Sequence, residues 1–283
     1  FGKIKDKKIL KEYKDSGNNS GNNLFALFLN KSLQLSKNVA LVLPKSFISS
    51  PEHDQIRKKI ESRNIFSILD FGEYGFKGVK IETIGLILNG KKKLYNKVKF
   101  YSYANKNYIL QDQDYIIDSE FPYWLLYRNN FFDKICKKMK FGIFDFFRDR
   151  QITKKHTLNK GKIRVLKSRN ISNNNILSLD GYDTYLNDIN NFVVSKYLNK
   201  KNTYLVPNLT YYPRACKLPE NCIVDGSAAL LFPKNDQKIN NKQLEFFASE
   251  EFTSFYRIAR NFGTRSLNID RNSIFFWGLK KVI

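Results

Sequence analysis

The sequence is poor in cysteine, histidine and methionine, and it contains no long apolar run. Its three cysteines (Cys136, Cys216 and Cys222) form no C-x-x-C pair and leave one over, so buried thiols in a reducing cytoplasm are expected rather than disulfides. No apolar stretch approaches the roughly 20 residues that a membrane span requires, and no signal peptide is recognisable. The sequence therefore predicts a cytoplasmic protein without a membrane partner.

Acidic residues are also scarce. The 283 residues include 26 Asp and Glu against 49 Lys and Arg, a formal net charge of +23. This balance favours a polyanionic partner, most commonly nucleic acid. The chain is also rich in Lys, Asn, Ile, Phe and Tyr, as AT-rich genomes encode, but such bias would not concentrate charge. Residues 119–170 nevertheless carry 14 Lys and Arg against 4 Asp and Glu.

Sites for metals, phosphates or hydrolysis are not predicted. His53 and His156 have no Cys or His partners at metal-ligand spacing, and no Ser-His-Asp set or carboxylate pair stands out. Gly72, Gly75 and Gly78 depart from G-x-G-x-x-G and precede a strand rather than a helix, so a phosphate loop is rejected. We expect these glycines to let a loop approach DNA closely.

Residues 22–89 have the most regular pattern in the chain. Helices are predicted where apolar residues recur every three or four positions, and strands where they are consecutive. In chain order the predicted elements are helix 22–33, strand 39–43, a helix that begins at 49–51 and reaches 63, strand 65–71, loop 72–78 and strand 79–88. Strand 39–43 is apolar at every position, as in a parallel sheet covered on both faces. This order predicts half of a doubly wound sheet that ends in a β-hairpin.

The remaining segments are predicted with less regularity. Residues 3–21 are expected to form a flexible Lys-rich loop, and residues 91–118 a closing strand pair and a connector. Further predictions are strands at 163–171, 203–206, 222–224 and 228–232 and one helix at 241–261. A composition change near Asp118 predicts two domains, 1–118 and 119–283.

Three runs in the first domain carry a family resemblance: 23–29, 40–47, and 69–73 with Phe76. They resemble the γ-class adenine-N6 DNA methyltransferases of bacterial restriction–modification systems. In that family the segment follows a catalytic Asn-Pro-Pro-(Tyr/Phe) tetrapeptide, and Phe1-Gly2-Lys3 looks like its last residue with the usual Gly-Lys. The resemblance implies an amino-terminal half, in the same chain or in a separate subunit, that carries Asn-Pro-Pro and the S-adenosylmethionine site. No cofactor-binding residue is expected in the present chain.

Two observations on the residues agree with a missing half. Residue 1 is Phe and the only methionine is Met139, so we expect a piece of a longer protein or a processed product. A strand as apolar as 39–43 needs neighbours on both edges, and the chain offers strands on one side only.

The resemblance also implies roles in base flipping. Phe1 would stack on one face of a flipped adenine and Phe76 would approach from the other side, with Tyr74 as the second candidate for that position. Stacking contributes roughly 1–3 kcal/mol per base, which offsets the cost of unstacking the base. The alternative for Phe76 is a core aromatic in a Phe-rich protein.

The second domain carries its own resemblance. Strand 163–171 resembles the start of a target-recognition domain, and residues 225–233, 255–260 and 264–267 resemble methyltransferases that accompany type IIS restriction enzymes. Arginine can pair with guanine and lysine more often meets phosphate. The DNA-binding candidates are Lys3, Tyr74, Arg164, Lys167, Arg169, Arg214, Arg257, Arg260 and Arg265.

The expected fold is therefore α/β: the second half of a Rossmann-like methyltransferase sheet, followed by an α+β target-recognition domain. The expected function is methyl transfer from S-adenosylmethionine to adenine in double-stranded DNA, once the other half is supplied. A non-catalytic DNA-recognition subunit with a degenerate methyltransferase shell is the alternative, and an RNA methyltransferase is a weaker third.

Overall fold

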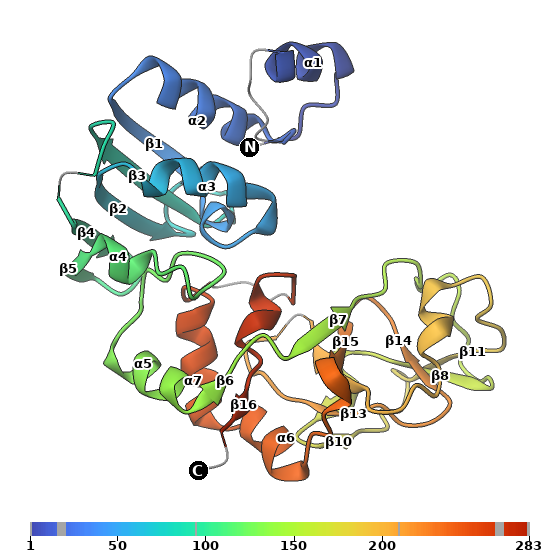
Figure 1. Cartoon of the computed structure of the whole chain (residues 1–283). Helices are drawn as coiled ribbons and strands as arrows, with labels where there is room; N and C mark the ends of the chain where they lie inside the picture. The colour runs from blue at the N-terminus through green and yellow to red at the C-terminus, as the bar shows by residue number, and fades with distance from the viewer. Residues whose placement is uncertain (1, 16–20, 94, 209, 264–268, 282–283) are drawn as a thin grey trace. The chain divides into compact units, whose positions relative to one another are not determined.

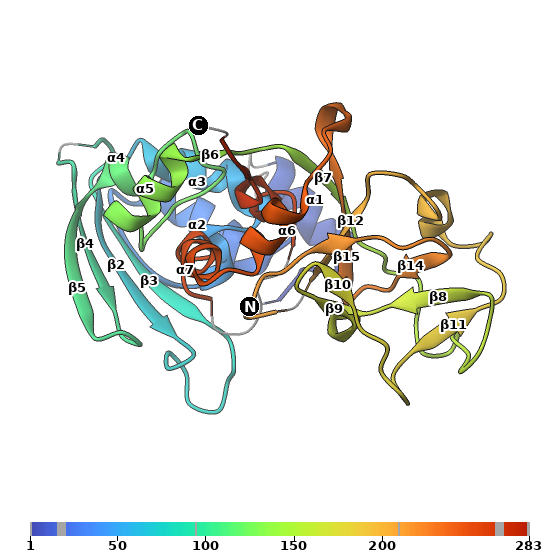
Figure 2. The same cartoon turned by 90° about the horizontal axis from the view of Figure 1, so that it is seen from below.

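The structure is a computed structural model that describes residues 2–15, 21–93, 95–208, 210–263 and 269–281. It divides into two compact units, unit 1 (Phe1–Arg128) and unit 2 (Asn129–Ile283). Both units mix helices with sheets (Figures 1 and 2). The division falls ten residues beyond the domain boundary predicted at Asp118.

Unit 1 contains one five-stranded sheet and its helices. The elements are α1 (Lys7–Asp15), α2 (Leu24–Leu35), β1 (Asn38–Pro44), η1 (Lys45–Ile48), η2 (Pro51–His53), α3 (Asp54–Glu61), β2 (Ile65–Gly72), β3 (Thr83–Asn89), β4 (Lys97–Ser102), β5 (Asn107–Asp112) and α4 (Gln113–Ile116). The predicted helices, strands and closing strand pair of residues 22–112 are found, except that the strand predicted over 79–88 begins at Thr83 because residues 79–82 belong to the preceding loop.

The strand order of this sheet is β1-β3-β2-β4-β5. Strand β3 runs antiparallel to both β1 and β2, so the predicted hairpin is confirmed, and β2 pairs with β4 in parallel. Strands β1, β2 and β4 therefore point the same way and end at the same edge of the sheet. The one described neighbour of β1 is the antiparallel strand β3.

Within the described residues, strand β1 is covered on one face only, so the predicted cover on both faces is not found in unit 1 itself. Helices α2 and α3 lie on one face of the sheet (Figure 1), and there Val39 and Leu43 are buried. Residues on the other face alternate with these, and Val42 is 44% exposed. The reason is that the elements of unit 1 supply cover for one face only.

The prediction of a loop over residues 3–21 is also wrong in part, because Lys7–Asp15 form the helix α1. The Asp6 side chain accepts a hydrogen bond from the Lys8 backbone N–H at 2.8 Å at its start. Before it, Gly2 and Ile4 exchange backbone hydrogen bonds with residues 22–24. Residues 16–20 lie outside the described residues.

Polar contacts explain why residues 119–128 belong to unit 1. The Trp124 indole N–H donates to Glu61 Oε1 at 2.9 Å, and Arg128 pairs with Asp118 at 2.7 Å. Such contacts cannot be read from composition. The composition change near Asp118 therefore lies before the boundary between the units, which follows Arg128.

Unit 2 is built, in its described residues, from short strands and three α-helices, the last of which packs against the other two. Its elements are α5 (Asn130–Lys137), β6 (Met139–Lys140), β7 (Phe144–Phe147), β8 (Ile163–Leu166), η3 (Ser168–Asn170), β9 (Ile171–Ser172), β10 (Asn175–Ile176), β11 (Thr184–Leu186), η4 (Val193–Tyr197), β12 (Tyr204–Pro207), β13 (Cys216–Lys217), β14 (Cys222–Val224), β15 (Ala228–Pro233), η5 (Lys234–Asp236), α6 (Asn241–Phe247), α7 (Glu250–Ala259), η6 (Ser273–Phe276) and β16 (Leu279–Lys280). The larger sheets have the orders β13-β12-β15-β7 and β11-β8-β14.

Two predictions in unit 2 need correction. The single helix predicted over 241–261 is two helices, because Ser249 caps α7 by accepting a hydrogen bond from the Phe252 N–H at 3.1 Å. A side chain that satisfies a free helical N–H favours a new helix start at that point. The strand predicted over 163–171 is interrupted by the turn η3.

His53 makes the stability of unit 1 depend on pH. The side chain is 1% exposed and its ring lies 4.8 Å from that of Phe25. Burial lowers the pKa of His53 to about 4, against an ordinary value of 6.5. The folded state therefore binds fewer protons than the unfolded state as the pH falls from 6.5 toward 4, and stability is lost in that window.

We expect wild type to lose about 2 kcal/mol of unfolding free energy between pH 7 and pH 5 relative to His53→Phe. Phenylalanine fits the same aromatic surroundings and does not titrate. Urea unfolding of both proteins at each pH measures the difference. The titrating groups of unit 2 are the same in both proteins, so their contributions to the pH dependence cancel. Parallel pH dependence of the two proteins would contradict the assignment.

Candidate nucleic-acid interface

The carboxyl ends of β1, β2 and β4 form one edge of the sheet in unit 1. In open α/β sheets, ligands bind beyond this edge. A loop of residues 73–82 leaves β2 here and returns as β3. Gly72 has a φ of +54°, and a Cβ on Gly75 would lie 2.1 Å from Thr83 Oγ1. Glycine is therefore favoured at Gly72 by its positive φ and at Gly75 because a side chain there would collide with Thr83.

Two aromatic side chains of this loop are accessible. Tyr74 is 72% exposed and Phe76 is 45% exposed. The ring of Tyr74 lies 5.5 Å from that of Tyr103, just beyond the end of β4. Phe76, predicted from the sequence as a stacking residue, is thus accessible beyond the carboxyl edge of the sheet rather than enclosed in the core.

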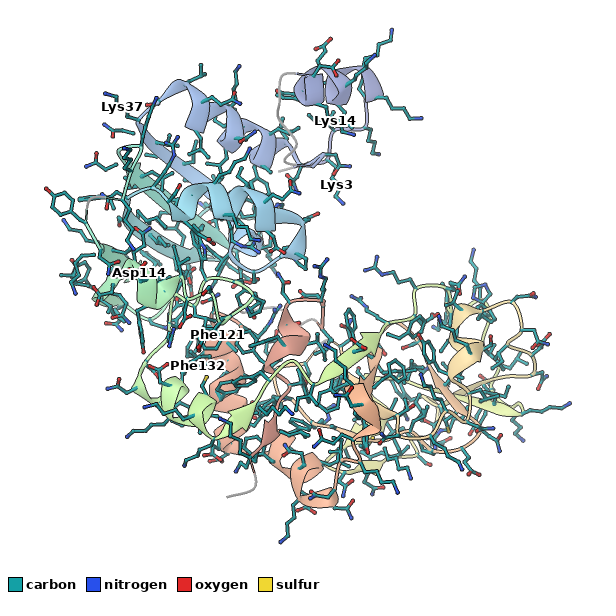
Figure 3. All side chains as sticks on the ribbon, viewed as in Figure 1. Lys3, Lys14, Lys37, Asp114, Phe121 and Phe132 are labelled. Atoms are coloured by element: carbon teal, nitrogen blue, oxygen red, sulfur yellow. The ribbon has the colours of Figure 1, made fainter. Side chains whose placement is uncertain are left out.

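The amino-terminal residues lie at the same edge. Lys3 forms a bridge with Asn23 before α2, and its ammonium group is 4.0 Å from Glu52 of η2, which follows β1. Figure 3 shows Lys3 projecting from this part of unit 1. Phe1, the other predicted stacking residue, lies outside the described residues.

A buried polar cluster fastens this edge. Lys45 Nζ lies 2.6 Å from Asp70 Oδ2 and 3.7 Å from Glu82 Oε1, and Lys45 and Asp70 are almost fully buried. The Tyr127 hydroxyl donates to Asp70 Oδ2 at 2.6 Å and lies 2.8 Å from Ser102 Oγ. Burial, reinforced by the Asp70 charge, raises the pKa of Tyr127, so the hydroxyl stays protonated and can donate.

This cluster joins the ends of three strands to the aromatic loop. Lys45 follows β1, Asp70 lies near the end of β2 and Ser102 ends β4. Asp70 Oδ1 also accepts from the Gly72 N–H at 2.9 Å, at the point where the loop begins. Sequence analysis missed the cluster, although an Asp inside the apolar strand 65–71 was a signal for a buried partner.

The predicted DNA-binding residues of unit 2 divide into engaged and accessible groups. Arg164 pairs with Asp183 at 2.5 Å and donates to the Leu177 carbonyl, so its guanidinium is occupied within the fold. This contact lowers the pKa of Asp183, although burial opposes it. Lys167 and Arg169 lie over the ring of Tyr182, at 4.4 and 4.8 Å from its centre. Lys167 is half-buried and its Nζ donates to the Tyr182 carbonyl at 2.7 Å, whereas Arg169 is exposed.

The remaining predicted arginines differ in the same way. Arg257 is exposed on α7, whereas Arg260 is partly buried 3.9 Å from Asp270. Arg214 donates only to oxygens of its own unit. Arg265 lies outside the described residues.

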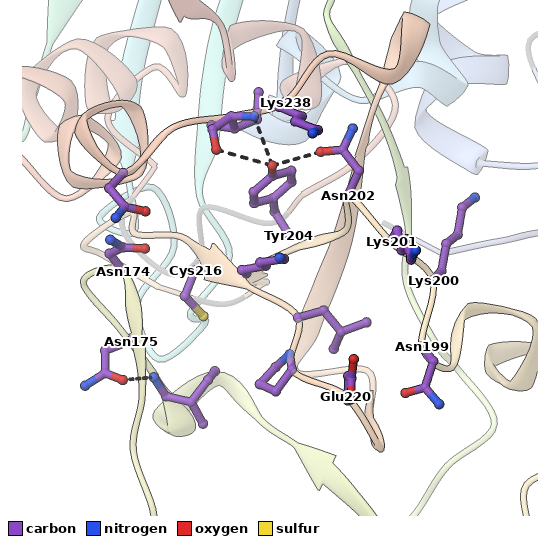
Figure 4. A pocket seen from close by; sticks show the side chains of 16 residues that line it. Asn174, Asn175, Asn199, Lys200, Lys201, Asn202, Tyr204, Cys216, Glu220 and Lys238 are labelled. Atoms are coloured by element: carbon purple, nitrogen blue, oxygen red, sulfur yellow. Dashed lines mark hydrogen bonds between the residues drawn. The ribbon is translucent and has the colours of Figure 1, made fainter.

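Unit 2 also contains a basic hollow of about 830 Å³ (Figure 4). Side chains from β12, β13 and the adjacent segments line it. Tyr204 is one of the lining residues, and its hydroxyl forms hydrogen bonds with the Asn202 side chain and the Ile239 backbone. Its charged lining residues are Lys200, Lys201, Lys217, Lys238 and Glu220. The hollow carries four cations against one anion, which suits an anionic ligand.

Some kinds of site are not found among the described residues. They contain no group of three or more His, Cys, Asp or Glu side chains placed to hold a metal ion. None of the described helices is long and apolar enough to cross a membrane.

No protein-family model matches the chain, and no curated protein matches its sequence. Similar solved structures include the type IIG restriction endonuclease BpuSI (TM-score 0.40, 10% identity, 99% of this chain and 45% of that chain). Others are the type IIL restriction–modification enzyme MmeI with DNA (0.46, 12%, 89% and 40%) and the ATP-dependent type ISP restriction–modification enzyme LlaBIII bound to DNA (0.45, 9%, 98% and 28%). The chain spans less than half the length of each.

The buried cluster predicts strong coupling between Lys45 and Asp70. Lys45→Met should lower the unfolding free energy by about 3–5 kcal/mol, because it leaves a buried carboxylate without its cation. Asp70→Asn should lower the unfolding free energy much less in the Lys45→Met variant than in the wild-type chain. Chemical denaturation of the two single variants and the double variant measures the coupling.

Lys97→Met is the matched control, since Lys97 pairs with Asp112 at 2.8 Å while both side chains are about half exposed. It should cost less than about 1 kcal/mol. Additive effects of the two buried substitutions would show that the cluster does not act as a unit.

Proposed function

We propose that this chain is the carboxy-terminal part of a site-specific DNA adenine-N6 methyltransferase of a restriction–modification system. Unit 1 would be the second half of the catalytic lobe, and unit 2 the target-recognition domain. The observation that carries the proposal is the outer edge of β1, an apolar strand to which no described strand adds on that side.

The outer edge of β1 has, over Val39–Leu43, none of the features that usually protect an exposed strand edge. Alternate backbone N–H and C=O groups of such a strand point away from its sheet and can pair with another strand. Edge strands in native proteins commonly carry charge, proline or a bulge against unwanted pairing, but Val39–Leu43 is apolar and pairs with β3 without a register shift. We infer that this edge receives a strand of the amino-terminal methyltransferase half.

The uncovered face of the sheet supports the same partner. Register places one row of residues side by side across the strands: Val42, Gly85, Leu69, Tyr101 and Tyr108. Val42 is 44% and Tyr108 57% exposed, although the row has no charged side chain. A helix of the other half would bury this face and complete a sheet covered on both sides.

The methyl donor would bind mainly to the other half. In unit 1 the glycine-bearing loop leads into a strand, so it presents no helix amino terminus to a nucleotide-like ligand. These residues do not fit a donor pocket of their own, and we route no step through S-adenosylmethionine on this chain.

The contribution of this chain would be to hold the base and the DNA. Phe76, with Tyr74 beside it, would stack on the flipped adenine at the carboxyl edge of the sheet. The Asp70 cluster would keep their loop in place. In unit 2 the basic residues would neutralise phosphates, which contributes affinity for DNA of any sequence and weakens with salt.

The chain alone should transfer no methyl groups. Incubation with DNA and labelled S-adenosylmethionine should incorporate label only when a polypeptide that carries Asn-Pro-Pro and the donor site is added. Label incorporated by the chain alone would refute the division of labour. A stable complex that binds DNA and never methylates it would favour the non-catalytic recognition subunit instead.

Phe76→Ala in the completed enzyme should lower the methylation rate by about 5-fold or more, because stacking contributes at least roughly 1 kcal/mol. DNA affinity should change much less, since phosphate contacts supply most of it. Single-turnover methylation and fluorescence anisotropy measure the two quantities. Val79→Ala, at a 44% exposed position of the same loop, is the control; equal effects of both variants would remove Phe76 from the site.

A further inference from the structure

The turn between β12 and β13 exposes two consecutive tyrosines. Tyr211 is 50% and Tyr212 68% exposed, although the flanking Pro213 and Ala215 are buried. Two adjacent exposed rings form a larger aromatic surface than a single exposed tyrosine does. Neither tyrosine was singled out by the sequence analysis, because two tyrosines in a Tyr-rich chain form no pattern.

The turn that carries the two tyrosines is stabilised by hydrogen bonds from the Arg214 side chain. Its Nε donates to the Ile171 carbonyl at 2.5 Å and Nη2 to the Ser168 carbonyl at 3.0 Å. Its Nη1 donates to Thr210 Oγ1 at 3.1 Å and to the Tyr212 carbonyl at 3.0 Å. One guanidinium thus joins the tyrosine turn to the segment 168–171.

Thr210 closes the turn on itself. Its hydroxyl donates to the Tyr212 carbonyl at 2.9 Å and accepts from the Tyr212 N–H at 3.1 Å. The backbone of the exposed pair is therefore fixed before any ligand arrives, so less conformational entropy is lost on binding. A turn built in this way around exposed aromatic rings is a prepared contact surface.

The segment to which Arg214 ties the turn carries positive charge. Arg169 lies within it and Lys167 directly precedes it, and both cations lie over the ring of Tyr182. Lys167 Nζ also donates to the Tyr182 carbonyl at 2.7 Å, whereas Arg169 is exposed, and the described residues show no carboxylate partner for either cation. Exposed aromatic rings tied to a segment that carries cations have the chemistry of nucleic-acid stacking surfaces, in which rings contact bases and cations contact phosphates.

We propose that Tyr211 and Tyr212 stack on DNA bases at a locally opened step, while Lys167 and Arg169 contact the flanking phosphates. Arg214 is the positioning residue for the pair. This inference rests on the proposed function in that the partner is DNA, and it adds the element of unit 2 that contacts the bases. A protein partner for the same rings is the competing outcome.

The test is binding of the full chain to a fluorescein-labelled DNA duplex of mixed sequence, measured by anisotropy over a range of salt concentrations. Tyr211→Ala/Tyr212→Ala should weaken binding by about 5-fold to 150-fold for each base that is stacked, from the typical stacking contribution. The slope of log affinity against log salt should stay unchanged, because no charge is removed.

Three variants serve as matched controls. Tyr95→Ala removes a tyrosine that is 71% exposed in unit 1 and should bind as wild type does. Tyr211→Phe/Tyr212→Phe keeps both rings and should retain the affinity. Arg169→Gln removes one phosphate contact and should reduce the salt slope by about 0.9.

Wild-type affinity of the double alanine variant would overturn the inference and favour a protein partner for this turn. So would a loss of salt slope equal to that of Arg169→Gln, because the tyrosines would then only support the cations. Methyl transfer by the completed enzyme is scored separately. Tyrosine-dependent binding without methylation contradicts the proposed function alone, and methylation with tyrosine-independent binding contradicts this inference alone.

Discussion

The unfilled hydrogen-bonding edge of β1 is the constraint on which this account depends. Backbone groups at a strand edge must be satisfied by water or by another strand, and an apolar strand exposed to water also leaves its side chains uncovered. In unit 1 both conditions meet on the same strand, because Val42 is exposed on the face opposite α2 and α3. A partner that supplies a strand and a covering helix removes both.

The buried cluster around Asp70 orders the carboxyl edge of the five-stranded sheet. Charges in an apolar interior are tolerated when each is paired and hydrogen-bonded, and here Lys45 and Tyr127 satisfy the carboxylate. Because the members come from the ends of several strands, the loop with Tyr74 and Phe76 starts from a fixed point. The edge can therefore be in place before the proposed other half binds.

Much of unit 1 could be predicted from the sequence, because its elements follow simple periodicity. Helix α2 and strands β1 and β2 have apolar spacings that differ clearly between helix and strand. The break at Ser249 was missed because apolar spacing continues through it, while a single capping hydrogen bond decides the boundary. The division between the units lies ten residues beyond the boundary predicted from composition, because Trp124 and Arg128 contact Glu61 and Asp118 of unit 1.

The candidate sites were less predictable than the fold. Residue type indicated positive charge in unit 2 correctly, but not which cations the fold itself uses. Arg164 is occupied by Asp183, whereas Arg169 is accessible over Tyr182. The Lys45–Asp70 pair joins residues 25 positions apart, and no local pattern reveals such a contact. Which side chains pair with each other is decided by the tertiary structure and not by local sequence.

The most direct measurement of the central claim is amide hydrogen exchange of the chain with and without the proposed amino-terminal methyltransferase half. Strand β5 forms the opposite edge of the same sheet and is the internal reference. The account predicts that amides of β1 become protected in the complex while those of β5 exchange at unchanged rates. Exchange in β1 that is unaffected by a bound, active partner half would contradict it.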